Sequence, residues 1–155
     1  MTVPSPLLVV AAAVIHEGRL LVVSKKAAPA IFYLPGGKPE PAETAEQTLA
    51  RELAEELGVA PVDARLLGHV RAVAAIERVP MLMTVFAAGL SGEPTPSAEI
   101  SALAWTTGDD AHAPSLAPAL TWHVIPMLRS TGALAESAVA GQYGERGRYP
   151  HWPGW

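Results

Sequence analysis

Cysteine is absent from the 155-residue chain. Its absence excludes disulfide bonds, thiolate zinc sites and cysteine nucleophiles. The chain also has no run of lysine or arginine, and its formal net charge is −4, so an extended nucleic-acid surface is not expected. No membrane span is expected either, because the apolar stretch over residues 7–15 is too short. That stretch also lacks the preceding basic residues of a secretory signal, so we expect a cytoplasmic protein.

The length of the chain suits one domain, and half of its residues are hydrophobic, which is enough for a sizeable core. We expect this domain to occupy residues 1–132. Residues 133–155 form a glycine-rich tail, which holds two of the four tryptophans in its last four residues. Aromatic-rich termini can dock on protein surfaces. The tail is therefore predicted to pack on its own domain or on a partner subunit, and the second arrangement would make the protein a homodimer.

Apolar patterns predict strands over residues 7–15, 19–24, 65–75, 79–88 and 99–105, the first two joined as a hairpin. Residues 27–30 are predicted as a small, alanine-rich loop after Lys25 and Lys26. These lysines either meet phosphate or lie in a solvated loop. Residues 116–128 have helical periodicity, although Pro126 conflicts with a regular helix.

Three groups of polar or sulfur-containing side chains outside the central segment have simple structural interpretations. Met81 and Met83 are typical of core filler, with a substrate-lining role as the alternative. Asp109 and Asp110 are expected to cap a short helix, with contact to a nucleobase edge as the alternative. The five histidines are scattered along the chain and indicate no histidine metal site.

A central helix is predicted over residues 45–57. Thr44 or Glu43 opens the segment, which consists mostly of strong helix formers. Leu49, Leu53 and Leu57 recur at i, i+4 and i+8 and form one apolar stripe. Gly58 follows directly, where a helix end favours a left-handed residue.

Glu52, Glu55 and Glu56 share one face of this helix. Like charges at that spacing destabilise a helix, so a compensating charge is needed. Clustered oxygen ligands suit a hard cation such as Mg²⁺ or Mn²⁺. Arg51 stands at i−4 to Glu55 and can relieve part of the repulsion. The alternative is a solvated acidic face without a ligand.

The helix is preceded by Pro35, Gly36 and Gly37, which mark a sharp turn after the apolar residues 31–34. Two glycines let the backbone come close to a ligand or a metal. An ordinary turn between a strand and a loop is the alternative.

Residues 37–59 fit one template, G-x5-E-x7-R-E-U-x-E-E-x-G-U, in which U is aliphatic. This template is the Nudix box, and the chain resembles a Nudix hydrolase, MutT-like in size. The resemblance implies a fold of the α/β/α sandwich type within the α+β class, a mixed β-sheet with helices on both faces. In outline it covers residues 7–130.

The resemblance also implies roles for individual residues. Glu52 and Glu56 are the expected metal ligands, and Glu55 is a further ligand or the base that orients the attacking water. Arg51 would orient the carboxylates, and Glu43 would support the loop or a metal-bound water. Further candidates are Glu99 as an extra ligand or base, the Gly37 carbonyl as a metal ligand, and a substrate-binding set of Phe32, Gly36, Gly37 and Lys38. Phe32 takes the place where many relatives carry tryptophan.

These features predict a metal-dependent pyrophosphohydrolase, with Mg²⁺ or Mn²⁺ as cofactor, that cleaves a nucleoside diphosphate linked to another moiety. Its only predicted partner besides a second subunit is this small molecule. The alternative is a non-catalytic, nucleotide-sensing module, against which the intact carboxylate set argues. An isomerase of prenyl diphosphates on this fold would need a cysteine. Substrate choice is expected to reside in loops 25–30, 76–80, 91–99 and 107–115.

Overall fold

The computed structural model describes residues 5–135. Its strands are β1 (Leu7–Ala13), β2 (Ile15–His16), β3 (Arg19–Lys25), β4 (Ala28–Tyr33), β5 (Gly36–Gly37), β6 (Pro61–Val73), β7 (Pro80–Leu90) and β8 (Ile100–Thr106). The helices are α1 (Ala45–Leu57) and α2 (Ile125–Ser130), with a 3-10 turn at Ala113–Ser115 and a π-helical turn at Leu120–Val124. The expected docking concerns the tail over residues 133–155, of which residues 136–155 lie outside the described residues.

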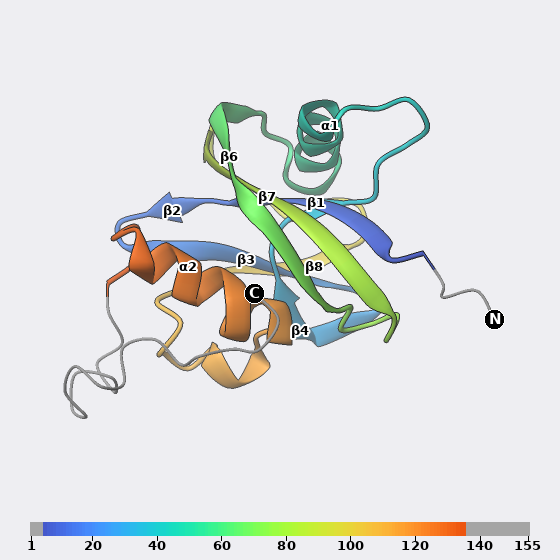
Figure 1. The fold of residues 1–155 in the computed structure, drawn as a ribbon. Coiled ribbons are helices and arrows are strands. Elements are labelled where there is room, and N and C mark those ends of the chain that lie inside the picture. Colours follow the sequence, from blue (N-terminus) through green and yellow to red (C-terminus); the bar gives the residue numbers. More distant parts are fainter. Residues whose placement is uncertain (1–4, 136–155) are drawn as a thin grey trace.

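The strands form two sheets. One has the order β5-β1-β7-β6, in which β1 and β7 are parallel and the other pairs antiparallel. In the other sheet β3 pairs with β2, β4 and β8. Helix α1 covers one side of the strands and α2 the other (Figure 1). The predicted mixed sheet with helices on both faces is thus confirmed.

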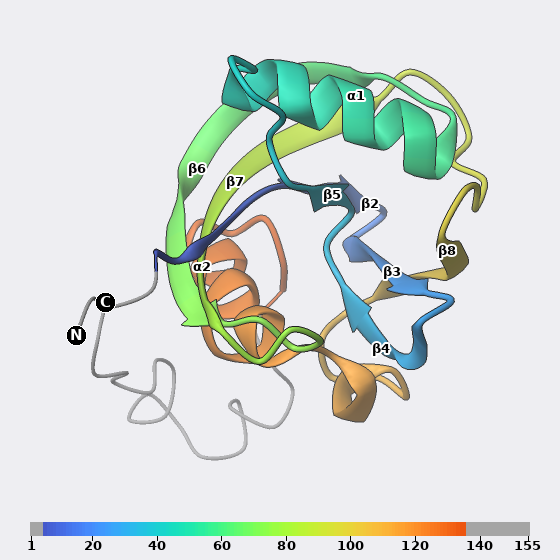
Figure 2. The same ribbon diagram turned by 90° about the vertical axis from the view of Figure 1, so that its right-hand side faces the viewer.

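Each side of the strands has its own core, because buried strand residues alternate between the two faces. Beneath α1, the stripe Leu49, Leu53 and Leu57 packs on a cluster that includes Val10 and Phe86. Beneath α2, the core is formed by residues that include Val22, Val70, Val85, Leu120, Val124 and Leu128. The long hairpin β6–β7 curves along one side of the molecule, from α1 towards α2 (Figure 2).

Helix α1 begins and ends where the sequence predicted. Thr44 is the N-cap and accepts from the Gln47 N–H, while the Gln47 side chain accepts from the Thr44 N–H, so a full capping box is present. Gly58 ends the helix with φ 67°, a left-handed conformation that glycine adopts without strain.

Residues 116–128, whose helical periodicity conflicts with Pro126, do not form one regular helix. A π-helical turn, in which the Ile125 N–H bonds to the Leu120 carbonyl, leads into the six-residue α2. Pro126 is the physical reason, since it has no N–H and its ring clashes with the carbonyl four residues earlier in a regular helix. The wider π turn separates these groups, and Pro126 lies in the first turn of α2, where a missing N–H is tolerated.

Two strand boundaries also differ from the prediction. Residues 28–30 belong to β4 rather than to a loop, because Ala28 pairs with Lys25 across a turn of only two residues. Strand β6 begins at Pro61, which pairs with Leu90, rather than at residue 65 as predicted. None of the helices within residues 5–135 is long and apolar enough to cross a membrane.

Candidate active site

The Gly36–Gly37 turn is pressed between β1 and α1. A side chain at Gly36 would overlap the Val10 carbonyl, and a side chain at Gly37 would overlap the Glu52 carboxylate. Because glycine has no Cβ, both contacts become available. The turn therefore brings backbone directly against a carboxylate of α1.

Glu56 is the most deeply buried acid of the site, with 1% of its surface exposed. Its Oε1 accepts from the Gly36 N–H at 2.9 Å. Its Oε2 is buried and has no hydrogen-bond partner within residues 5–135. Burial and, to a smaller extent, the neighbouring Glu52 charge raise the pKa of Glu56 to about 7, although the Gly36 bond opposes the shift. The site thus holds a carboxylate whose second oxygen lacks a donor among the described residues.

Glu52 lies one turn before Glu56 on the same face of α1. Its carboxylate rests against Gly37, and its Oε1 accepts from Arg51 Nη1 at 2.9 Å. Burial raises the pKa of Glu52, while the Arg51 hydrogen bond opposes the shift. Two carboxylates with raised pKa values therefore stand side by side at the glycine turn, an arrangement typical of functional sites.

Arg51 ties the loop before α1 to the helix. Its Nε and Nη2 donate to both Glu43 oxygens at 2.8 and 2.9 Å, and Nη2 also donates to the Lys38 carbonyl at 2.9 Å. The predicted pair with Glu55 is present but longer, at 3.4 Å. The Arg51 hydrogen bonds lower the pKa of Glu43 to about 2. Sequence reasoning missed Glu43 as the main partner, because the pairing depends on the path of the loop rather than on helical spacing.

Glu55 is the exposed member of the acidic face, with 54% of its side chain accessible. Arg51 lies among Glu43, Glu52 and Glu55, while Glu56 turns towards Gly36. Within residues 5–135, consequently, no three acidic or histidine side chains are already gathered closely enough to hold a metal. The structure brings Glu52 and Glu56 together, and Glu55 stays at the rim.

A cavity of about 410 Å³ opens beside the glycine turn. Its polar lining includes Gly36, Gly37, Lys38 and Glu52. Its walls are mainly apolar and include Leu7, Val9, Met81, Met83 and Leu120. The two methionines, interpreted from sequence as core filler, thus line the cavity as well as packing on the core. A concave, apolar chamber next to a few polar groups is typical of a small-molecule site.

Lys25 and Glu99 meet at this cavity, because β3 and β8 are paired. Lys25 Nζ lies 3.6 Å from Glu99 Oε1, and both residues line the cavity. The Glu99 charge also contributes to raising the pKa values of Glu52 and Glu56. Glu99 therefore lines the same cavity as Glu52, and its role as an extra ligand or base stays a prediction. Lys26 is not among the residues that line the cavity.

Phe32 stands apart from the rest of the predicted substrate-binding set. It bridges to Leu116 and packs against His112, with ring centroids 5.7 Å apart. Tyr33 lines the cavity instead, since consecutive strand residues point to opposite faces. Sequence reasoning missed Tyr33. Knowing which residues of β4 point to the cavity face would have identified it.

The acidic pair after β8 has structural partners. Asp110 accepts hydrogen bonds from the Thr106 hydroxyl and from the N–H groups of Thr107 and His112, and Asp109 pairs with Arg129 at 3.1 Å. The pair therefore fixes a turn at the end of β8.

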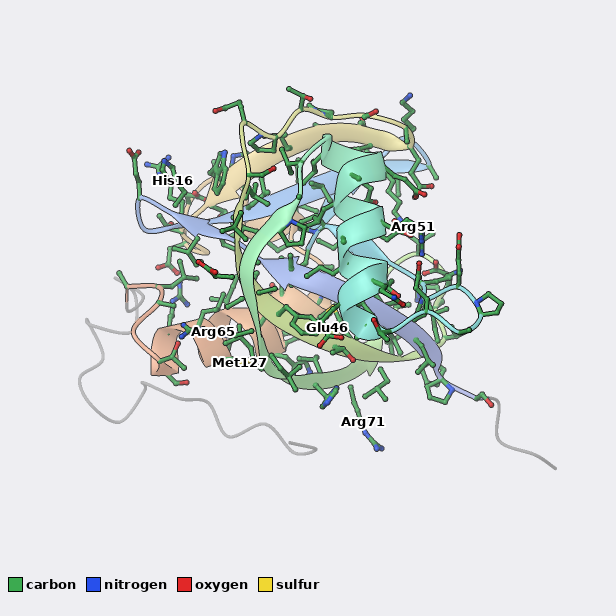
Figure 3. The ribbon with its side chains drawn as sticks, turned by 90° about the horizontal axis from the view of Figure 1, so that it is seen from above. His16, Glu46, Arg51, Arg65, Arg71 and Met127 are labelled. Carbon is green, nitrogen blue, oxygen red and sulfur yellow. The ribbon has the colours of Figure 1, made fainter. Side chains whose placement is uncertain are left out.

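His16 is one of the scattered histidines, and it lies on the opposite side of the molecule from Arg51 when the molecule is seen from above (Figure 3).

Similar sequences and structures identify the family of this chain. The NUDIX domain family model matches residues 6–128. A Mycobacterium tuberculosis protein named "Putative 8-oxo-dGTP diphosphatase 2" is 34% identical over 115 residues, or 72% of this chain and 81% of that protein. The crystal structure of a MutT NUDIX hydrolase from Burkholderia pseudomallei is 34% identical with a TM-score of 0.59, over 66% of this chain and 83% of that one.

A more distant structure shares the fold. It is a bifunctional NMN adenylyltransferase/ADP ribose pyrophosphatase from Francisella tularensis, solved with AMP and a manganese ion. Its TM-score is 0.62 at 20% identity, over 82% of this chain and 42% of that one. Nudix enzymes generally use divalent metals and act on small nucleotide substrates. The chain belongs to the NUDIX family and is a hydrolase that acts on phosphoric anhydride bonds.

Proposed function

We propose that this chain cleaves a nucleoside diphosphate linked to another moiety, with Mg²⁺ or Mn²⁺ bound by residues of the box. The buried Glu56 carboxylate carries the proposal. One oxygen is fixed by the Gly36 N–H, and the other lacks a partner within residues 5–135. A buried carboxylate oxygen without a partner is unfavourable. A cation at this oxygen would provide the missing partner.

The donors around Glu56 suit a hard divalent cation. Glu52 lies beside it, Gly37 offers a backbone carbonyl, and Glu55 can join if its contact with Arg51 opens. Such oxygen donors are the ligands that Mg²⁺ and Mn²⁺ prefer. When bound, the ion would neutralise charge on the diphosphate and acidify the attacking water.

The remaining residues position the substrate and accept the proton. Arg51 joins Glu43, Glu52 and the Lys38 carbonyl in one hydrogen-bond network. This network fixes the position of the glycine turn relative to α1. Lys25 and Lys38 line the cavity and supply positive charge for phosphate oxygens. The exposed carboxylates Glu55 and Glu99 are the groups available to take a proton from the attacking water.

The cavity supports a nucleotide substrate. Its mainly apolar walls, which include Met81, Met83 and Leu120, suit the flat faces of a nucleobase. The carboxylates stand at the end where the diphosphate would lie. The mycobacterial relative is named for 8-oxo-dGTP, which is a nucleoside diphosphate linked to phosphate and so belongs to the same class of substrate.

A substrate panel tests the proposal. ADP-ribose, nucleoside triphosphates and nucleotide sugars are incubated with Mg²⁺ or Mn²⁺, and nucleoside monophosphate release is measured. Glu56→Gln is expected to lower turnover at least about 100-fold while the circular dichroism spectrum is unchanged. Glu46→Gln is the matched control, because Glu46 is exposed in the first turn of α1 (Figure 3) and is not among the residues that line the cavity.

Two results would contradict the proposal. Undiminished hydrolysis by Glu56→Gln would remove this carboxylate from the mechanism. Tight binding of the panel compounds in Mg²⁺ without product release would favour the alternative, a nucleotide-sensing module. The intact set Glu52, Glu55 and Glu56 on α1 favours the enzyme.

A further inference from the structure

The Tyr33 hydroxyl is a buried polar group without a hydrogen-bond partner within residues 5–135. The residue ends β4, and its side chain lines the cavity beside the glycine turn. Its ring packs against both cores, and Lys25 Nζ lies 5.4 Å from the ring centroid. The ring is therefore held in place, and its hydroxyl points to a fixed position.

A buried hydroxyl without a partner lowers stability, so its presence needs an explanation. The described residues contain three such atoms: Ser24 Oγ, Tyr33 Oη and Glu56 Oε2. The Glu56 oxygen belongs to the proposed metal site. Ser24 is not among the residues that line the cavity, whereas Tyr33 is. Tyr33 is thus the one of the two hydroxyls that a substrate could reach.

The charges around Tyr33 indicate what kind of group it would meet. Burial, followed by the negative charges of Glu56, Glu99 and Glu77, raises the Tyr33 pKa well above its usual range. The hydroxyl therefore stays protonated and can donate a hydrogen bond. Because the walls of the cavity that Tyr33 lines are mainly apolar, a neutral acceptor on the part of the substrate that lies against them suits this donor.

We propose that Tyr33 is a specificity-determining residue whose hydroxyl donates a hydrogen bond to a neutral acceptor on the nucleoside part of the substrate. This inference rests on the proposed function. The phosphates lie at the carboxylate end of the cavity, and the apolar walls receive the base. Tyr33 contacts the substrate beyond the phosphates and helps to select which nucleoside is accepted.

Tyr33→Phe tests the proposal, because it removes the hydroxyl and keeps the ring. With the best substrate of the panel, KM is expected to rise about fivefold to tenfold while kcat stays within about twofold. Inhibition by imidodiphosphate, which has phosphates but no nucleoside, is expected to be unchanged. The melting temperature without substrate is expected to rise by roughly 2–4 °C, because an unpaired buried hydroxyl is gone.

Ser24→Ala is the matched control, because it removes the other unpaired buried hydroxyl. It is expected to raise the melting temperature similarly and to leave KM unchanged. An unchanged KM in Tyr33→Phe would overturn the inference, and so would a loss of stability, which would show that the hydroxyl has a structural partner. Weaker inhibition by imidodiphosphate would overturn it too, by placing the hydroxyl at the phosphates.

The two proposals fail in different ways. If the unmodified protein hydrolyses panel compounds but Tyr33→Phe has the same KM, only the Tyr33 role is wrong. If the unmodified protein neither binds nor hydrolyses any nucleoside diphosphate derivative, the proposed function is wrong and the Tyr33 role falls with it.

Discussion

Gly36 donates its backbone N–H to Glu56 Oε1 at 2.9 Å, so the turn before α1 is bonded to a carboxylate in the last turn of that helix. This bond joins the glycine turn to the helix across 20 residues of sequence. It leaves Glu56 Oε2 as the oxygen without a partner within residues 5–135. Gly36 thereby fixes which carboxylate oxygen faces the proposed metal position.

Gly36→Ala is expected to destabilise the protein, because the new Cβ would overlap the Val10 carbonyl. The free energy of unfolding should fall by about 2–3 kcal/mol, as in other overpacked sites. Urea denaturation measures the change. Gly68→Ala is the matched control, since its nearest described neighbour is Met127 Cε at 3.7 Å. Equal destabilisation by the two substitutions would contradict the overlap argument.

The metal-free protein is expected to lose stability as pH rises from about 4.5 to about 7, the window set by the ordinary pKa of the Glu56 carboxyl and its raised value in the fold. The folded state binds a proton there more tightly than the unfolded state, so the contribution is complete below the window and lost above it. The change is about 3 kcal/mol as an order of magnitude.

Urea denaturation at several pH values without divalent metal measures this dependence. Glu56→Gln should flatten it, because the amide does not titrate. Mg²⁺ should stabilise the unmodified protein more at pH 8 than at pH 5, since it binds the ionised carboxylate. The same slope in Glu56→Gln as in the unmodified protein would assign the effect to another group, for example Glu52.

Local signals in the sequence were sufficient for α1. The Thr44 cap, the leucine stripe and Gly58 act within one helix, so they determine its ends without knowledge of the fold. Pro126 was recognised as a conflict, but its resolution by a π turn depends on packing against the core. Local propensity alone does not determine such a turn.

The contacts within the candidate site could not be predicted from local sequence signals alone. The pairing of Arg51 with Glu43 arises because the loop folds back over α1, and helical spacing pointed to Glu55 instead. Phe32 and Tyr33 differ by one strand position, and a shift of one residue exchanges the two faces. The phase of β4 is determined by its pairing with β3, so sequence alone placed the wrong ring at the cavity lining.

Glu99→Gln is expected to lower kcat about 100-fold, because we assign Glu99 the role of proton acceptor for the attacking water. The carboxylate is 61% exposed and lies 3.6 Å from Lys25 at the cavity. An exposed carboxylate at the cavity is accessible to a water molecule, which favours a base over a metal ligand. Steady-state kinetics at several Mg²⁺ concentrations measure kcat and the Mg²⁺ concentration for half-maximal activity.

The Mg²⁺ dependence separates the two roles of Glu99. A base should leave the half-maximal Mg²⁺ concentration within about twofold of the unmodified value, whereas loss of a metal ligand should raise it about 10-fold to 100-fold. Glu93→Gln is the control, because Glu93 is an exposed residue before β8 that does not line the cavity. A rise in the Mg²⁺ requirement with Glu99→Gln would make Glu99 a ligand and leave Glu55 as the proton acceptor, since Glu55 is the other exposed carboxylate of the site.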